Sequence, residues 1–215
     1  MPAPVSAQIE GPANGFLQSG GIMGEDAPGL AKAIADSTGQ ALSMFLSMAQ
    51  VMPGIPAPCD PISGSGATAG PGMFMPPPAG GPGASQIESP AEGFLSGQGI
   101  QGEDAGALAK VIAGGLAQAL TLFTAQGMVM PGIAIAGFVT AAPGMLMPVP
   151  LQSQLKPIVD GLMQQNGLRG DDAPKLAQAI AQSIDVALTM FASQVMVSPG
   201  IACAPGASAA PGRLM

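Results

Sequence analysis

Three pairs of acidic residues are the side chains of this protein whose types and spacing come closest to a chemical site. They are Glu25-Asp26, Glu103-Asp104 and Asp171-Asp172, and each pair opens a closely similar stretch of sequence. If the three pairs converge, their six carboxylates supply the oxygen ligands that Ca²⁺ or Mg²⁺ prefers. The simpler interpretation is that Asp26, Asp104 and Asp172 each cap a helix by accepting a hydrogen bond from a free backbone N–H. We favour capping, and we expect neither a metal site nor a cofactor.

The other potentially reactive motifs give little support to catalysis. The chain has no histidine, so the usual general base and the commonest metal ligand are missing. Ser153-Gln-Leu-Lys156 matches the S-x-x-K pattern of penicillin-binding enzymes, but the equivalent position reads Ser85-Gln-Ile-Glu88 and no K-T-G or S-D-N motif accompanies it. Gly64-Ser-Gly66-Ala-Thr-Ala69 lacks the flanking strand and helix of a dinucleotide-binding loop, so we interpret it as a flexible turn. We predict that the chain is not an enzyme.

Two cysteines, Cys59 and Cys203, each follow a Pro-Gly-Ile sequence in a predicted loop. Two cysteines do not make a disulfide framework. One bridge is possible if the first and third loops meet, but we favour unpaired thiols.

The acidic pairs introduce three long stretches that align without gaps, residues 24–55, 102–133 and 170–201. Their apolar residues recur at steps of three, four and seven, which indicates one buried stripe on an α-helix. A Pro-Gly pair near the end of each stretch stops a helix. We predict helices near 27–51, 105–129 and 173–197. The predicted core residues are Leu30, Ile34, Phe45, Leu108, Ile112, Phe123, Leu176, Ile180 and Phe191.

A shorter apolar element and a glycine-rich turn precede each long helix, which predicts an αα-hairpin. Pro12, Pro90 and Pro157 lie early in these elements, where a first helical turn tolerates proline. An extended arm follows each Pro-Gly-Ile and ends at a second Pro-Gly. We expect the apolar ends of these arms to contact other subunits through Met145, Leu146, Met147, Leu214 and Met215.

The expected architecture is mainly α, with three tandem helix-turn-long-helix repeats and extended Pro/Gly-rich arms. The repeats span residues 1–78, 79–150 and 151–215 and form one fused unit, since about 70 residues bury little surface alone. A Pro-rich linker, residues 76–82, separates the first two. We favour a pseudo-threefold bundle over the rival solenoid, because solenoid units rarely include long irregular segments.

Composition narrows the classes of partner. The net charge is −7 and only 9% of residues are charged, so no basic patch meets nucleic-acid phosphates. Glycine and proline together make up about a quarter of the chain, which favours order achieved with the help of partner subunits. The N-terminus lacks the basic and apolar regions of a signal peptide. Polar residues interrupt the longest apolar run, so buried core helices are favoured over membrane spans.

The Ala-rich helices followed by Pro-Gly-Ile and then by a Pro-Gly-x-Leu-Met ending resemble small virion proteins of tailed bacteriophages and related contractile injection particles. The resemblance covers the repeats and implies a non-enzymatic component of a tail, baseplate or capsid. It implies assembly in the host cytoplasm, location in the virion, and other subunits of the same assembly as partners in a homo- or hetero-oligomer. The alternative is a membrane-active or membrane-anchored assembly protein that uses its apolar helices as lipid contacts.

Overall fold

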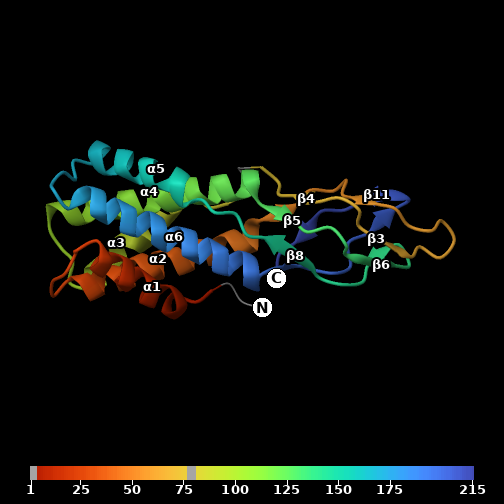
Figure 1. Cartoon of the computed structure of the whole chain (residues 1–215), viewed down its shortest axis with the longest axis horizontal. Coiled ribbons are helices and arrows are strands. Elements are labelled where there is room, and N and C mark those ends of the chain that lie inside the picture. The colour runs from red at the N-terminus through yellow and green to blue at the C-terminus, as the bar shows by residue number, and fades with distance from the viewer. Residues whose placement is uncertain (1–3, 77–80) are drawn as a thin grey trace.

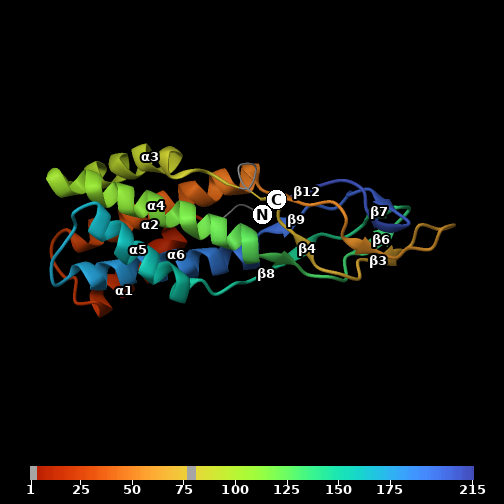
Figure 2. The same ribbon diagram turned by 90° about the horizontal axis from the view of Figure 1, so that it is seen from above.

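The computed structural model describes residues 4–76 and 81–215, and in this part of the chain it contains six α-helices and twelve short strands. Helices occupy one end of an elongated molecule and strands the other (Figures 1 and 2). The helices are α1 (Ser6–Ser19), α2 (Ala27–Met48), α3 (Ala84–Gly97), α4 (Glu103–Gln126), α5 (Gln152–Gln165) and α6 (Ala173–Gln194). The mainly α prediction is confirmed, whereas most of the expected linker, residues 77–80, lies outside the described residues.

The three long helices start close to their predicted positions and end earlier, at Met48, Gln126 and Gln194. The residue that follows each helix takes up extended backbone, with ψ of 135° at Ala49, 140° at Gly127 and 141° at Val195. The next two residues then form a strand. The Pro-Gly pairs therefore follow a strand rather than the helix, because residues such as Val51 gain hydrogen bonds and packing by pairing with an arm.

Three phenylalanines, one from each long helix, form the centre of the core. Phe45, Phe123 and Phe191 are fully buried, and their ring centroids are 5.5 to 6.0 Å apart in edge-to-face arrangements. Such contacts add to the free energy gained by burying the rings. All the predicted core residues are buried except Leu176, which is half-buried because it lies at the open end of the bundle.

Each short helix packs against two long ones, so the bundle closes around the central axis. Helix α1 contacts α2 and α6, α3 contacts α4 and α2, and α5 contacts α6 and α4. The expectation for the prolines is wrong, since Pro12, Pro90 and Pro157 lie inside these helices rather than in the first turn. Proline in a helix interior costs a backbone hydrogen bond, and the tertiary contacts with two long helices offset this cost.

Six strands next to the bundle form a closed circuit of antiparallel pairs. They are β1 (Gln50–Val51), β4 (Gly72–Met73), β5 (Met128–Val129), β8 (Gly144–Met147), β9 (Met196–Val197) and β12 (Gly212–Arg213). Strand pairs join β4 to β5, β5 to β8, β8 to β9 and β12 to β1. The bridges Val51–Phe74 and Val197–Leu214 complete the circuit, which we call the inner ring.

A second circuit, the outer ring, lies farther from the helices (Figure 1). Its strands are β2 (Pro56–Ala57), β3 (Gly66–Ala67), β6 (Ala134–Ala136), β7 (Val139–Thr140), β10 (Cys203–Ala204) and β11 (Gly206–Ser208). Strand pairs and the bridges Cys59–Gly66 and Val139–Ala202 connect them. The arms expected to reach outward instead pair with one another, which satisfies their backbone hydrogen bonds within the chain.

The two Pro-Gly pairs of each arm need glycine for different reasons. The first glycines adopt positive φ, near 95°, a conformation that other residues rarely take. The second glycines face the crowded interior of the inner ring, where a Cβ at Gly144 would lie 2.6 Å from Ile133 Cδ1. The first set is Gly54, Gly132 and Gly200, and the second is Gly72, Gly144 and Gly212.

A buried hydroxyl on each arm holds the Pro-Gly-Ile turn of another arm. Thr68 Oγ1 accepts hydrogen bonds from the backbone N–H groups of Gly132 and Ile133 at 3.0 and 2.9 Å. Thr140 Oγ1 accepts one from Ile201 N at 2.9 Å. Ser208 Oγ accepts two, from Gly54 N and Ile55 N, each at 3.0 Å. These hydroxyls tie the three arms together in a cycle.

We expect the Thr140→Val variant to lower the free energy of unfolding by about 1–3 kcal/mol, because it leaves the buried N–H of Ile201 without its side-chain acceptor at nearly constant volume. Urea denaturation of the purified chain measures the change. Thr140→Ser, which keeps the hydroxyl, is the matched control and should recover most of the loss. A loss in Thr140→Ser as large as that in Thr140→Val would contradict the prediction, because Thr140→Ser keeps the hydroxyl and removes only the methyl group.

Candidate functional site

The acidic pairs lie at the start of the long helices but do not cap them. Asp26 and Asp172 occupy the N-cap positions of α2 and α6, and neither makes a side-chain capping hydrogen bond. Asp104 lies within the first turn of α4, whose N-cap is Gly102. The capping prediction is therefore wrong. At Asp26, φ and ψ of −85° and −14° are helical, whereas a capping residue needs extended backbone to turn its side chain toward the free N–H groups.

A carboxylate cap does occur, but it comes from a residue that the sequence pattern did not single out. Asp185 Oδ1, on α6, accepts hydrogen bonds from Leu151 N at 2.6 Å and Gln152 N at 3.1 Å, at the start of α5. This cap joins two helices instead of acting within one. Its partner is 34 positions away in sequence, so a local search for capping residues does not find it.

The same carboxylates do not assemble into a metal site among the described residues. Over that part of the chain, no group of three or more His, Cys, Asp or Glu side chains is placed to hold an ion. Glu25, Asp26, Asp104, Asp171 and Asp172 are exposed at the helical end of the molecule. The Glu103 side chain lies outside the described part.

The remaining motifs are structural in this fold. Lys156 Nζ donates to Asp160 Oδ2 at 3.0 Å, one turn along α5, so its ammonium is paired with a carboxylate rather than with Ser153. The glycine-rich segment 64–69 is a strand and turn: Gly66 begins β3, and Thr68 is one of the buried hydroxyls. It is fixed by backbone contacts, so the expected flexible turn is not what the fold contains.

The five residues expected at an interface divide into two sets. Met145, Met147 and Met215 are 40–55% exposed, as expected. Leu146 and Leu214 are only 2% and 8% exposed and belong to the main core, so their assignment to an interface is wrong. Side chains alternate between the two faces of a strand, so a Met-Leu-Met strand turns its leucine inward and its methionines outward.

The same alternation around the inner ring produces a belt of methionines on its outer face, which we call the methionine girdle. Its members are Met52, Met73, Met75, Met128, Met130, Met145, Met147, Met196 and Met215. Each is exposed or half-buried, and Met128 lies directly between Met73 and Met147 on neighbouring strands. Val51, Phe74, Val129, Leu146, Val197 and Leu214 face inward and are buried. Flexible thioethers suit surfaces that adapt to a partner.

No protein-family model, curated protein or solved structure matches this chain. Its function is therefore inferred from its own surfaces, among which the methionine girdle is an extended apolar one.

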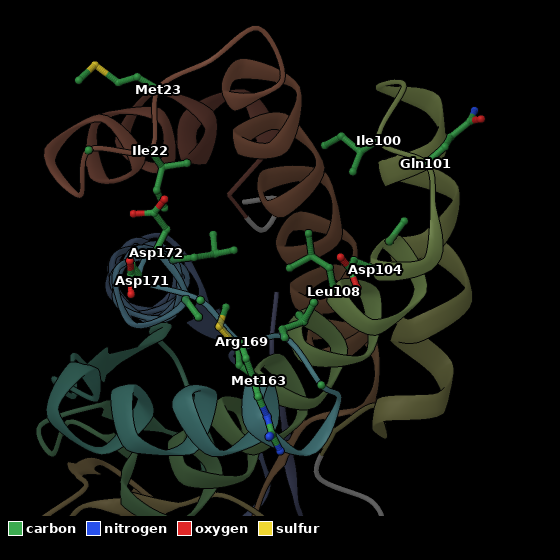
Figure 3. Close-up of a pocket in the computed structure, with 17 residues that line it drawn as sticks. Ile22, Met23, Ile100, Gln101, Asp104, Leu108, Met163, Arg169, Asp171 and Asp172 are labelled. Atoms are coloured by element: carbon green, nitrogen blue, oxygen red, sulfur yellow. The ribbon is translucent and has the colours of Figure 1, made fainter.

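A pocket of about 520 Å³ opens at the opposite, helical end, and we call it the end pocket. The turns before α2, α4 and α6 surround it, so it receives residues from all three sequence copies (Figure 3). Its walls include Ile22, Ile100, Leu108 and Met163, with Asp104, Asp171 and Asp172 also in its lining.

The most exposed of the large apolar side chains in the described part of the chain lies on a turn of the first arm. Ile62 is 92% exposed, on a turn in which Asp60 Oδ1 accepts hydrogen bonds from Ile62 N and Ser63 N at 3.0 and 2.7 Å. These hydrogen bonds lower the pKa of Asp60, and those donated by Ser63 have the largest effect. The charged carboxylate stabilises the turn at neutral pH, and this contribution is lost as the pH falls through the lowered pKa.

The two cysteines lie close together in the outer ring as free thiols. Cys203 is buried in a small cluster with Ala57 and Ile135, and the half-buried Cys59 packs against the same cluster. Burial raises the pKa of the Cys203 thiol, with a smaller contribution from Cys59. The first and third loops do meet, and the thiols are unpaired as favoured.

We expect iodoacetamide to alkylate Cys59 well before Cys203 in the native protein. The thiolate is the reactive form, and Cys203 has both the raised pKa and the smaller exposure. Peptide mass spectrometry after short incubations at pH 8 measures both rates. Denaturing the chain in urea is the control and should bring the two rates together; faster native labelling of Cys203 would contradict its burial.

Proposed function

We propose that this protein is a non-enzymatic structural component of a large symmetric assembly, and that it docks there through the methionine girdle. The type of assembly we favour is the virion of a tailed bacteriophage, at a tail, baseplate or capsid position. The neighbouring subunits of that particle would be its partners. The observation that carries the proposal is the belt of nine methionines on the outer face of a closed strand ring.

Three features support an arrangement of three tandem repeats around a pseudo-threefold axis. The phenylalanines of the long helices meet at one point, each short helix bridges two long ones, and the three buried hydroxyls link the arms in a cycle. A chain built in this way matches a threefold or sixfold position in a larger particle, because equivalent surfaces recur around its axis.

The composition of the girdle supports docking against protein. Five of its nine methionines count among the large apolar side chains that are well exposed: Met73, Met128, Met145, Met147 and Met215. The residues that interrupt the belt are Gln50 of β1, Arg213 of β12 and Ser198, which follows β9. Arg213 is the one charged residue among them. Contiguous apolar surface of this kind marks interaction sites in soluble proteins.

The alternative, insertion of the apolar helices into lipid, has weaker support. Helices α4 and α6 are long and apolar enough to cross a membrane, but just over half of the relevant residues in each are buried inside the bundle. Their phenylalanines lie in the core. Lipid contact through these helices would require the bundle to open, at the cost of that packing.

The experiment is photo-crosslinking in the native source, with a photoreactive amino acid in place of Met145 in the girdle. We expect crosslinks to subunits of one sedimentable particle, identified by mass spectrometry of the purified particle. The matched control places the same group at Gln164, an exposed position on α5.

Equal crosslinking from both positions would argue against girdle docking, and absence of the chain from any particle would refute the structural role. Release from its source by detergent but not by high salt or denaturant would favour the lipid alternative.

A further inference from the structure

The end pocket combines an apolar interior with an acidic rim. Its apolar lining comes from the three turns, from the N-terminal parts of α4 and α6 and from the C-terminal end of α5: Ile22, Ile100, Leu108, Met163, Leu168 and Leu176. Its volume of about 520 Å³ is within the range of sites that enclose small ligands or side chains.

The carboxylates at this rim are only partly neutralised by the nearby basic groups. Asp104, Asp171 and Asp172 line the pocket and are exposed. Lys175 Nζ pairs with Asp172 Oδ1 at 2.8 Å, which offsets one charge. Arg169 extends away from Asp171 and Asp172 in Figure 3. Among the described residues, the ion pairs present are Lys175–Asp172 and, elsewhere, Lys156–Asp160.

Equivalent positions around the mouth hold different residues. In each turn an apolar residue, Ile22, Ile100 or Leu168, is followed by a residue that also lines the pocket. These following residues are Met23, Gln101 and Arg169. A trimer of identical chains would present one residue type three times at such a mouth. The single chain presents three, so its pocket can select one orientation of an asymmetric ligand.

We propose that the end pocket binds an apolar side chain on a positively charged segment of a partner protein. The apolar lining takes the side chain, and the exposed carboxylates attract flanking lysine or arginine residues across the rim. This docking site is separate from the methionine girdle and does not depend on it.

A second copy of this chain is the less favourable occupant. Its most exposed apolar side chain, Ile62, lies two residues from Asp60, a carboxylate that the turn keeps ionised. Insertion of this turn would bring that charge toward an acidic rim, and like charges disfavour the contact.

The test uses the full chain labelled with ¹³C in the methyl groups of Ile, Leu and Met, titrated with n-hexylammonium and, separately, with hexanoate. The two probes have equally long carbon chains and opposite charges. We expect saturable shifts of the Ile22, Ile100 and Met163 methyl signals with hexylammonium, and binding at least about tenfold weaker for hexanoate, as several exposed carboxylates acting together predict. Added salt should reduce the difference in affinity between the two probes, because it screens the charges at the rim.

The variant that tests the rim is the triple substitution Asp104→Asn, Asp171→Asn and Asp172→Asn, expected to abolish most of the preference for hexylammonium. The matched control is Glu10→Gln, Glu88→Gln and Asp36→Asn, which changes the net charge equally at residues outside the pocket. The control should keep the preference.

Stronger binding of hexanoate would overturn the proposal in favour of an anion held at the N-termini of α4 and α6. The proposal would also be overturned if neither probe shifted the methyl signals of Ile22, Ile100 and Met163. Self-association of the unliganded chain that Ile62→Asp abolishes would assign the pocket to a second copy. None of these results bears on the girdle, which the crosslinking experiment tests separately.

Discussion

Phe123→Ala is expected to destabilise the protein by about 3–5 kcal/mol, the range found when a buried phenylalanine is truncated in a close-packed core. Phe123 is fully buried and makes ring contacts with Phe45, Phe74 and Phe191. Its loss leaves a cavity where the three long helices meet, and the surrounding rings collapse into it only in part. Urea denaturation followed by circular dichroism measures the effect.

Phe94→Ala is the matched control, because Phe94 lies on the short helix α3 and is only half-buried. We expect this variant to lose clearly less stability than Phe123→Ala. Similar losses at both positions would mean that the phenylalanine cluster contributes no more than ordinary peripheral packing.

Deleting residues 203–215 is expected to have the largest effect of all, a loss of stability exceeding the roughly 2–5 kcal/mol of a single buried leucine truncation. The deletion removes β10, β11 and β12, and so opens both strand rings. It also removes Ser208, which holds the turn at Gly54 and Ile55. Thermal melting of the truncated chain checks the expectation; a melting curve identical to that of the full chain would show that the rest of the fold does not depend on the third arm.

Leu214→Ala and Met215→Ala refine this test at neighbouring positions. Leu214 is 8% exposed inside the inner ring, and Met215 is 40% exposed on the girdle. A loss confined to Leu214→Ala would show that the ring interior stabilises the fold while the girdle remains free for a partner.

The helices could be predicted because their signals are local. Apolar residues three and four positions apart lie on the same face of one helix, so Leu108, Ile112 and Phe123 were recognisable as core from their spacing alone. The rings could not be predicted in the same way, since Gln50 pairs with Arg213 from the opposite end of the chain. No local pattern specifies that partner.

Two errors have identifiable causes. The capping prediction considered residue type at Asp26 without its backbone conformation, which is helical in the fold. The interface prediction treated Met145, Leu146 and Met147 as one apolar end, although strict alternation within a short extended segment is itself a strand signal. Applied to each arm, that alternation separates Leu146 and Leu214 from the methionines on either side.

The pairing of β1 with β12 has a consequence for synthesis. Gln50 leaves the ribosome long before its partner Arg213, which is far away in sequence. Until then β1 has an unpaired edge, the kind of exposed strand that invites pairing with other chains. Contacts so distant in sequence also slow folding. Completion of the inner ring therefore requires that translation has passed β12, and a product that terminates before this strand would lack the finished girdle on which docking is proposed to depend.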